Sequence, residues 1–239
     1  MVRYLTVAAT VALMPSALAV SINEIAPNPN GADGSTQQIE LLGTAGTMFS
    51  GVLLSLESDS GGSAGTVDRL STITGTFDAN GLLVVDISDL ENPSNTLILL
   101  DSFSGSVGDD LDVDSDGLLD ASALSLFGNV FDAVGIADNT GDEDFLYAEQ
   151  VGGTDLAFSG DEPQLIFRDA VSLMWYAIND PAGSDAVDMF GNDVSFSLFD
   201  MDPSVSTFGA INPTLVPVPA AAWLFASALL TLGVRRKRN

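Results

Sequence analysis

Alternating carboxylates give one stretch of this sequence the residue types and spacing of a metal-binding loop. The segment DLDVDSDGLLD runs from residue 110 to residue 120. Counted from its second aspartate, carboxylates occupy positions 1, 3, 5 and 9 of an EF-hand-like loop, and a glycine occupies position 6. Ca²⁺ takes about six to eight oxygen ligands, and the glycine allows the sharp turn that such a loop needs. The sequence therefore predicts a calcium site whose ligands are Asp112, Asp114, Asp116, the carbonyl of Leu118, and Asp120.

The predicted site departs from the EF-hand pattern at its end. Position 12 is Ala123, where an EF-hand supplies a bidentate glutamate. Water or another carboxylate has to supply the missing ligand, and Asp109 and Asp110 lie just upstream. We therefore expect weak binding, with a dissociation constant of about 10⁻⁴–10⁻³ M. The alternative is a loop that is only solvated. The acidic stretch at residues 138–145 has the same two interpretations, as a solvated loop or as a source of further ligands.

The composition excludes several classes of site. The 239 residues include no cysteine and no histidine, which removes disulfides, thiolate nucleophiles, zinc–thiolate sites and histidine-based triads. All 33 acidic residues lie between the two chain ends, where Arg69 and Arg168 are the only basic residues. This part of the chain therefore carries a net charge of about −31. Such a surface repels nucleic acid and attracts cations, so we expect no nucleic-acid binding.

The acidity leaves one enzymatic alternative. Paired carboxylates can hydrolyse glycosides, and acidic clusters with a divalent metal can cut phosphodiesters. These acids cluster in loop-type sequence, however, and the only lysine, Lys237, lies in the C-terminal tail, where it cannot hold a phosphate in the domain. We expect a protein that is not an enzyme. The alternative is a secreted, metal-dependent hydrolase of matrix polysaccharide or nucleic acid.

Short apolar runs surround the acidic segment and have to position it. The runs are IELLG, GVLLSLES, STITGTF, GLLVVDIS, TLILLDS, VFDAVGIA, PQLIFRD, SLMWYAI and VSFSLFD. Turn-forming Gly, Asn, Asp, Ser and Pro clusters separate them, which predicts an all-β sandwich. No change of composition marks a linker, so we expect one domain over residues 20–214 with the acidic loop inserted in it. Trp175 and Tyr176 are expected in its core.

The N-terminus has the parts of a secretory signal peptide. Arg3 is followed by an apolar run and by the small-residue site Ala17-Leu18-Ala19. We therefore expect residues 1–19 to be a signal peptide that is cleaved after Ala19.

The C-terminus, residues 215–239, combines a proline motif, an apolar segment and a basic tip. The 16 residues from Pro219 to Val234 carry no charge. At about 1.5 Å per residue they span about 24 Å as a helix, a little less than a hydrocarbon core of about 30 Å. Four basic residues follow and favour a cytoplasmic C-terminus: Arg235, Arg236, Lys237 and Arg238. We expect a single transmembrane helix, either retained as an anchor or removed after sorting.

Several segments resemble the lamin-tail domains of exported bacterial proteins. They are INEIAPNPNGADGSTQQIELLG at residues 22–43, FSGSVGDDLDVDSDGLLD at 103–120, VFDAVGIAD at 130–138 and FGAINP at 208–213. The resemblance implies an immunoglobulin-like β-sandwich, with Gln38 where the family usually has an aromatic residue.

The C-terminal motif resembles the PEP-CTERM class of sorting signals in its V-P-x-P-A form. The motif residues are Val216, Pro217, Val218, Pro219 and Ala220. The resemblance implies cleavage by an exosortase, a precursor held in the inner membrane, and a mature protein at the cell surface or outside the cell. Together with the acidic loop, it leads us to expect a calcium-stabilised structural or adhesive protein, with extracellular polysaccharide as a candidate partner.

Overall fold

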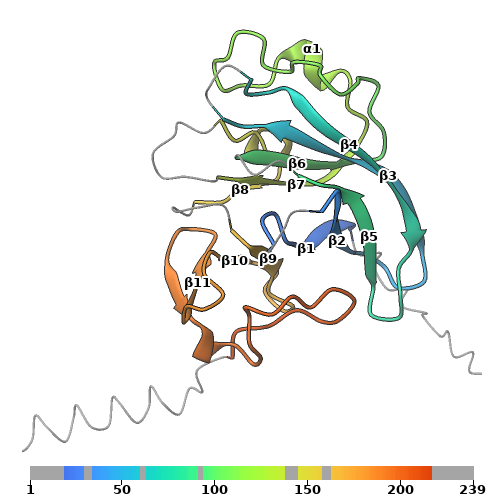
Figure 1. Ribbon diagram of the computed structural model, residues 1–239. Coiled ribbons are helices and arrows are strands. Elements are labelled where there is room, and N and C mark those ends of the chain that lie inside the picture. Colours follow the sequence, from blue (N-terminus) through green and yellow to red (C-terminus); the bar gives the residue numbers. More distant parts are fainter. Residues whose placement is uncertain are drawn as a thin grey trace, which may run out of the picture.

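The apolar runs form strands that pair into two sheets, as the computed structural model shows (Figure 1). The structure describes residues 19–29, 34–59, 63–90, 94–137, 145–157 and 163–216. The predicted all-β sandwich is confirmed at this level. Most of the predicted signal peptide and most of the sorting signal, residues 1–18 and 217–239, lie outside the described residues.

A seven-stranded antiparallel sheet forms one layer, in the order β12-β11-β10-β9-β1-β2-β5. Its strands are β1 (Ser21–Ile25), β2 (Thr36–Leu42), β5 (Leu82–Ser88), β9 (Leu165–Arg168), β10 (Trp175–Ile178), β11 (Asp185–Asp188) and β12 (Asp193–Ser195).

A five-stranded sheet forms the second layer, in the order β4-β3-β6-β7-β8. Its strands are β3 (Met48–Glu57), β4 (Val67–Thr76), β6 (Asn95–Leu100), β7 (Val130–Ile136) and β8 (Thr154–Asp155). All of its pairings are antiparallel except that of β7 with β8. The described residues also form three short helices: α1 (Ala121–Leu124) between β6 and β7, the 3₁₀ helix η1 (Glu149–Val151) between β7 and β8, and the 3₁₀ helix η2 (Phe196–Leu198) directly after β12.

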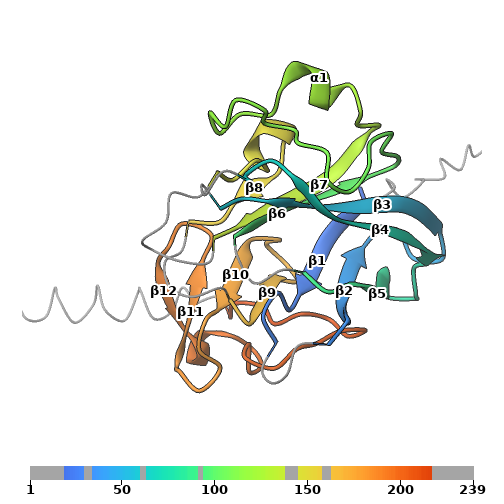
Figure 2. The ribbon, with the colours of Figure 1, turned by 45° about the horizontal axis from the view of Figure 1, so that its top comes forward.

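The main core lies between the two sheets (Figure 2). Ile39 and Leu41 of β2 enter it from one sheet, and Leu97 and Leu99 of β6 from the other. Trp175 is fully buried in the same cluster, and Tyr176 is buried on the other face of its strand, so the prediction of two core aromatic residues is confirmed.

One ion pair joins the two sheets at the edge of this core. The guanidinium of Arg168 on β9 bonds to Asp132 on β7 at 2.8 Å and lies 4.1 Å from the centre of the Trp175 ring. The cation thus has a charged partner and an aromatic face, which compensates for its partial burial.

Each sheet is also covered on its outer face, which gives the molecule two further clusters. Residues 101–129, here called the acidic cap, cover the five-stranded sheet; the cluster beneath includes Leu54 and Leu56 of β3 and Leu111 of the cap. Residues 196–216, here called the C-terminal cap, cover the seven-stranded sheet near β9 and β10. The acidic cap with α1 and the C-terminal cap lie at opposite ends of the molecule in Figure 1.

One predicted strand is largely wrong. The run VSFSLFD at residues 194–200 remains a strand only to Ser195 and then turns into η2. The turn allows Phe199 to pack on Phe167 and Tyr176, with ring centres 6.0 and 5.2 Å away. The aromatic side chains therefore serve the C-terminal cap instead of extending the sheet.

Candidate metal centre

The acidic loop lies inside the acidic cap, and apolar residues on both sides fix it to the five-stranded sheet. Leu111 and Leu119 are buried against the sheet just before and after the aspartates. The N–H of Asp120 donates to the carbonyl of Leu111 at 2.9 Å, which closes the loop at its base. The N–H of Leu111 donates to Gly65 in the β3–β4 turn at 2.9 Å. The loop therefore leaves and rejoins the sheet at one place.

Three of the predicted ligands converge. Asp112, Asp114 and Asp116 each offer a carboxylate oxygen, and these oxygens lie within 4.8 Å of one another. Asp112 is fully buried, whereas Asp114 and Asp116 are exposed. The cluster thus has a closed inner side and an open outer side from which an ion can enter.

Asp112 is the structural centre of the loop. One carboxylate oxygen, Oδ1, accepts a hydrogen bond from the N–H of Asp116 at 3.1 Å. The other, Oδ2, accepts from the N–H of Gly117 and from the hydroxyl of Tyr147, both at 2.9 Å. Three donors thus converge on one carboxylate, and these contacts fix the turn before any ion is present.

The turn itself requires left-handed backbone conformations. Gly117 has φ of 82°, and Ser115 adopts φ of 52° although it is not glycine. The N–H of Ser115 donates to the carbonyl of Asp112 at 2.9 Å, and that of Leu118 to Asp116 Oδ1 at 2.9 Å. A non-glycine residue in this region is held there by its surroundings, here by the hydrogen bonds around Asp112.

The electrostatics of the cluster favour a cation. The negative charge of Asp116 is the main cause that raises the pKa of Asp114, followed by partial desolvation and by the charges of Asp120 and Asp112. Like charges at this separation disfavour full ionisation unless a positive charge lies between them. A divalent cation would remove the repulsion that the aspartates exert on one another.

The remaining predicted ligands contribute less directly. The carboxylate of Asp120 accepts from the N–H of Val113 at 3.2 Å and lies outside the group of three. Asp109 and Asp110 each accept a backbone hydrogen bond, from Ser106 and Asp112 respectively, so both shape turns. Whether the Leu118 carbonyl and Asp120 bind an ion stays a prediction. Residues 138–144 of the second acidic stretch lie outside the described residues.

Two residues that hold the loop were missed from the sequence. Tyr147 is fully buried and bonds to Asp112. Gln150 accepts from the N–H of Leu119 and donates to the carbonyl of Gly117, both at 2.8 Å. Both come from the segment around η1, about 30 residues beyond the loop, and no spacing rule connects the two segments.

Two surface pockets of about 170 Å³ each lie elsewhere on the described part of the chain. One opens beside Asn23 and Asn212 and the other beside Gln164 and Ser206. Among the described residues that line them there is no aspartate or glutamate. A glycosidase places two carboxylates across a pocket, whereas the three aspartates here gather on an open turn.

Of the predicted sorting motif, the structure describes only Val216, which is exposed and whose N–H donates to the carbonyl of Leu198 at 2.8 Å. The other motif residues, the basic tip and Ala17 lie outside the described residues, and β1 begins two residues after Ala19. Within the described ranges, no helix is long and apolar enough to cross a membrane.

Comparison with protein-family models, curated proteins and solved structures found no match.

Proposed function

We propose that the chain is an exported structural or adhesive β-sandwich protein whose acidic cap binds Ca²⁺. The observation that carries the calcium part is the convergence of three carboxylates on a turn already fixed by Asp112. Bound Ca²⁺ would stabilise the cap on the five-stranded sheet, because an ion that binds only the folded loop adds its binding energy to folding.

The export part of the proposal rests on the two ends of the sequence. The signal-peptide pattern directs the chain across the inner membrane, and the V-P-x-P-A motif with its apolar segment and basic tip directs sorting. The resemblance to lamin-tail domains and to PEP-CTERM signals supports an immunoglobulin-like sandwich, exosortase processing, and residence at the cell surface or in an extracellular polysaccharide. Millimolar calcium outside the cell suits a site of the expected weak affinity.

The test is thermal unfolding of the full-length chain in non-ionic detergent, after treatment with chelator, with and without Ca²⁺. With a dissociation constant of about 10⁻⁴–10⁻³ M, a calcium concentration of about 10 mM stabilises the fold by about 1.4–2.7 kcal/mol. We expect the melting temperature to rise by about 3–10 °C. Asp114→Ala/Asp116→Ala should abolish the rise, because both residues lie on the open side of the cluster.

A charge-matched control separates binding from screening. Asp185→Ala/Asp193→Ala removes two exposed aspartates from the β11–β12 hairpin and should keep the full calcium response. An equal response in both double variants would show that Ca²⁺ only screens the negative surface. No response in the unaltered chain at about 10 mM would reduce the cluster to a solvated turn.

A further inference from the structure

Two glutamates lie directly opposite each other beneath the C-terminal cap. Glu24 of β1 pairs with Glu40 of β2 in the antiparallel register, and both are fully buried. Ile39 and Leu41 point into the core between the sheets, so Glu40 between them points to the outer face. A register irregularity between Ile22 and Glu24 places Glu24 on that outer face as well. Two carboxylates thus share one covered site.

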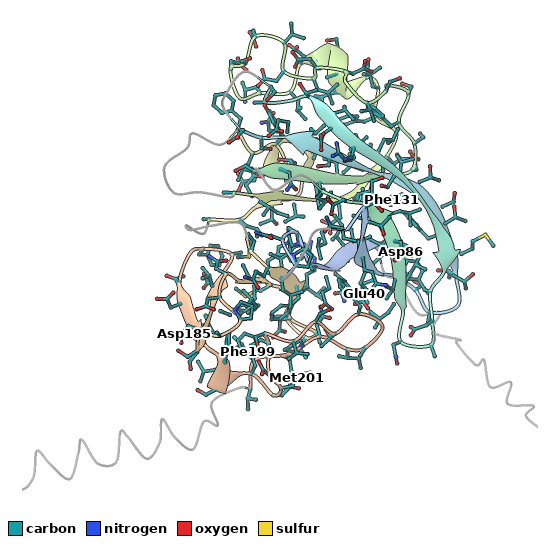
Figure 3. All side chains as sticks on the ribbon, in the orientation of Figure 1. Glu40, Asp86, Phe131, Asp185, Phe199 and Met201 are labelled. Carbon is teal, nitrogen blue, oxygen red and sulfur yellow. The ribbon has the colours of Figure 1, made fainter. Side chains whose placement is uncertain are left out.

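The C-terminal cap closes this site with its backbone. The N–H of Thr207 donates to Glu24 Oε1 at 2.7 Å, and the N–H of Gly209 donates to Glu40 Oε2 at 2.6 Å. A turn holds these donors in place, because the N–H of Ala210 bonds to the Thr207 carbonyl at 2.7 Å and Gly209 has φ of 81°. Figure 3 shows Glu40 on the side of the sheet that faces these C-terminal loops.

The hydrogen bonds around Thr207 favour a proton on the pair. Its hydroxyl lies 2.8 Å from Glu24 Oε2 and 2.9 Å from Asn212 Oδ1. The amide nitrogen of Asn212 donates to the carbonyls of Asn23 and Arg168, which fixes Oδ1 as an acceptor. One hydroxyl proton serves one acceptor. Both contacts of the hydroxyl are hydrogen bonds when Glu24 is protonated. The Glu24 carboxyl then donates to the Thr207 oxygen, and the Thr207 hydroxyl donates to Asn212 Oδ1.

The charges around the site work in the same direction. Burial is the main cause that raises the pKa of both carboxyls, and it outweighs the hydrogen bonds from the cap and from Asn23, which lower it. The pKa of Glu40 reaches about 7, with the charges of Glu24 and Asp78 adding to the rise. Asp78 lies in the β4–β5 turn, and Asp86 of β5 is exposed two pairs along the same face. Residues 203–213 of the cap carry no titratable side chain. On the neighbouring strand β9, the guanidinium of Arg168 is bonded to Asp132.

We propose that Glu24 and Glu40 form a proton-operated latch for the C-terminal cap. With one proton on the pair, the segment Thr207–Asn212 is held on the seven-stranded sheet. With both carboxylates ionised, their mutual repulsion, their burial and the loss of one of the two contacts of the Thr207 hydroxyl loosen it. The latch acts within a few residues of Val216, the first residue of the predicted sorting motif and the last described residue, and it does not depend on calcium binding.

The sign of the pH response follows from the raised pKa values. A carboxyl whose pKa is higher in the folded state contributes stability below its unfolded pKa, and this contribution is lost as the pH rises through the folded value. For Glu40 that range runs from 4.5 to about 7. A second contact of the C-terminal cap, its hydrogen bonds to Asp169, responds to pH in the opposite sense. At Asp169, burial opposes ionisation, but hydrogen bonds from Ser172, Leu215, Val171 and Thr214 outweigh it and lower the pKa. The hydrogen bonds to Asp169 therefore hold throughout the pH range in which the Glu24–Glu40 latch opens.

The experiment is hydrogen exchange of the full-length chain in non-ionic detergent at about pH 5 and about pH 8.5, with labelling times scaled for intrinsic exchange. We expect protection of the Gly209 N–H to fall by about 10- to 100-fold at the higher pH. Protection of the Leu215 N–H, bonded to Asp169 at 2.7 Å, should change far less. Equal protection of Gly209 at both pH values would overturn the latch.

Variants assign the response to the pair. In Glu24→Gln the amide can donate to Thr207 as the protonated acid does, and Glu40 loses the repulsion of its neighbour, so protection of Gly209 should fall much less between the two pH values than in the unaltered chain. Asp86→Asn, a change of an exposed carboxylate on the same face, should keep the response of the unaltered chain. A full pH response in Glu24→Gln would overturn the proposal.

A second measurement uses the unaltered chain and therefore does not depend on whether a variant folds. Infrared spectra of the unaltered chain with ¹³C-labelled glutamate should show a protonated glutamate carboxyl at about pH 6, well above the pKa of an exposed glutamate. The absence of that band would overturn the proposal.

Discussion

The acidic cap and the C-terminal cap each cover the outer face of a sheet, but the carboxylates that hold them lie on opposite sides of the contact. In the acidic cap, Asp112 belongs to the cap and draws its own backbone around itself. In the C-terminal cap, Glu24 and Glu40 belong to the sheet and receive backbone N–H groups from the cap.

This difference decides which ligand each site can meet. Asp112 is buried, but its neighbours Asp114 and Asp116 face solvent, so a hydrated cation can reach the cluster. Glu24 and Glu40 are covered by the segment they hold, and only a proton can compensate their charge without moving the cap. Excess carboxylate in an acidic protein can thus give either a metal site or a proton site, depending on which partner carries it.

The largest effect is expected from removing Phe199, the buried aromatic side chain with which the C-terminal cap packs on the seven-stranded sheet. Phe199 is 6% exposed and packs edge-on against Tyr176. We expect Phe199→Ala to cost about 3–4 kcal/mol in denaturant unfolding, as for other buried phenylalanines. Phe190→Ala, at a residue that is 65% exposed, is the control and should stay within about 0.5 kcal/mol of the unaltered chain. Similar small effects for both would mean that the C-terminal cap is held by its polar bonds alone.

In the acidic cap, the residue that holds the segment in place is polar: Asp112 does by hydrogen bonding what Phe199 does by packing in the C-terminal cap. Asp112→Ala leaves the N–H groups of Asp116 and Gly117 and the Tyr147 hydroxyl without their acceptor. We expect it to cost about 2–3 kcal/mol in chelator, measured by denaturant unfolding. Asp114→Ala should cause no loss under the same conditions, because that carboxylate is exposed and repelled by its neighbours.

Equal losses in the two aspartate variants would contradict this division between a structural and an ion-facing carboxylate. A loss in Asp114→Ala that appears only when Ca²⁺ is added would support it.

The acidic cluster could be predicted from the sequence because its ligands alternate within a short segment around a glycine. The spacing of Asp112, Asp114 and Asp116 is local information, and the structure brings these three together. Tyr147 and Gln150 could not be predicted, since they reach the loop only through the pairing of β6 with β7 and the path of the chain beyond.

The contact of the Glu24–Glu40 pair with the C-terminal cap could not be predicted from the sequence for a similar reason. Glu40 lies in IELL, where alternation predicts a polar side chain on the outer face of the strand, and Glu24 of INEI reaches the same face through the register irregularity after Ile22. Alternation does not reveal that this face is buried, because the cover comes from residues more than 160 positions later. Strand β6 gives the opposite lesson: it is buried at every position because both faces of its sheet are covered.

The smallest predicted effects test whether the two caps act independently. Tyr147→Phe removes the hydroxyl that bonds to Asp112 of the acidic cap, and Thr207→Val removes one hydroxyl from the C-terminal cap. Each should cost about 1 kcal/mol, the usual contribution of one hydrogen bond, in denaturant unfolding. In hydrogen exchange, the first should loosen Gly117 and the second Gly209.

The double variant Tyr147→Phe/Thr207→Val then tests whether the two caps contribute to stability independently. The two hydroxyls share no partner among their hydrogen bonds and lie over opposite outer faces of the sandwich, so the two losses should add within about 0.5 kcal/mol. A larger interaction energy would mean that loosening one cap changes the packing under the other, through the core that both sheets share. Ion binding at one end of the molecule would then affect the proton latch at the other, and the two sites would have to be treated as one coupled system.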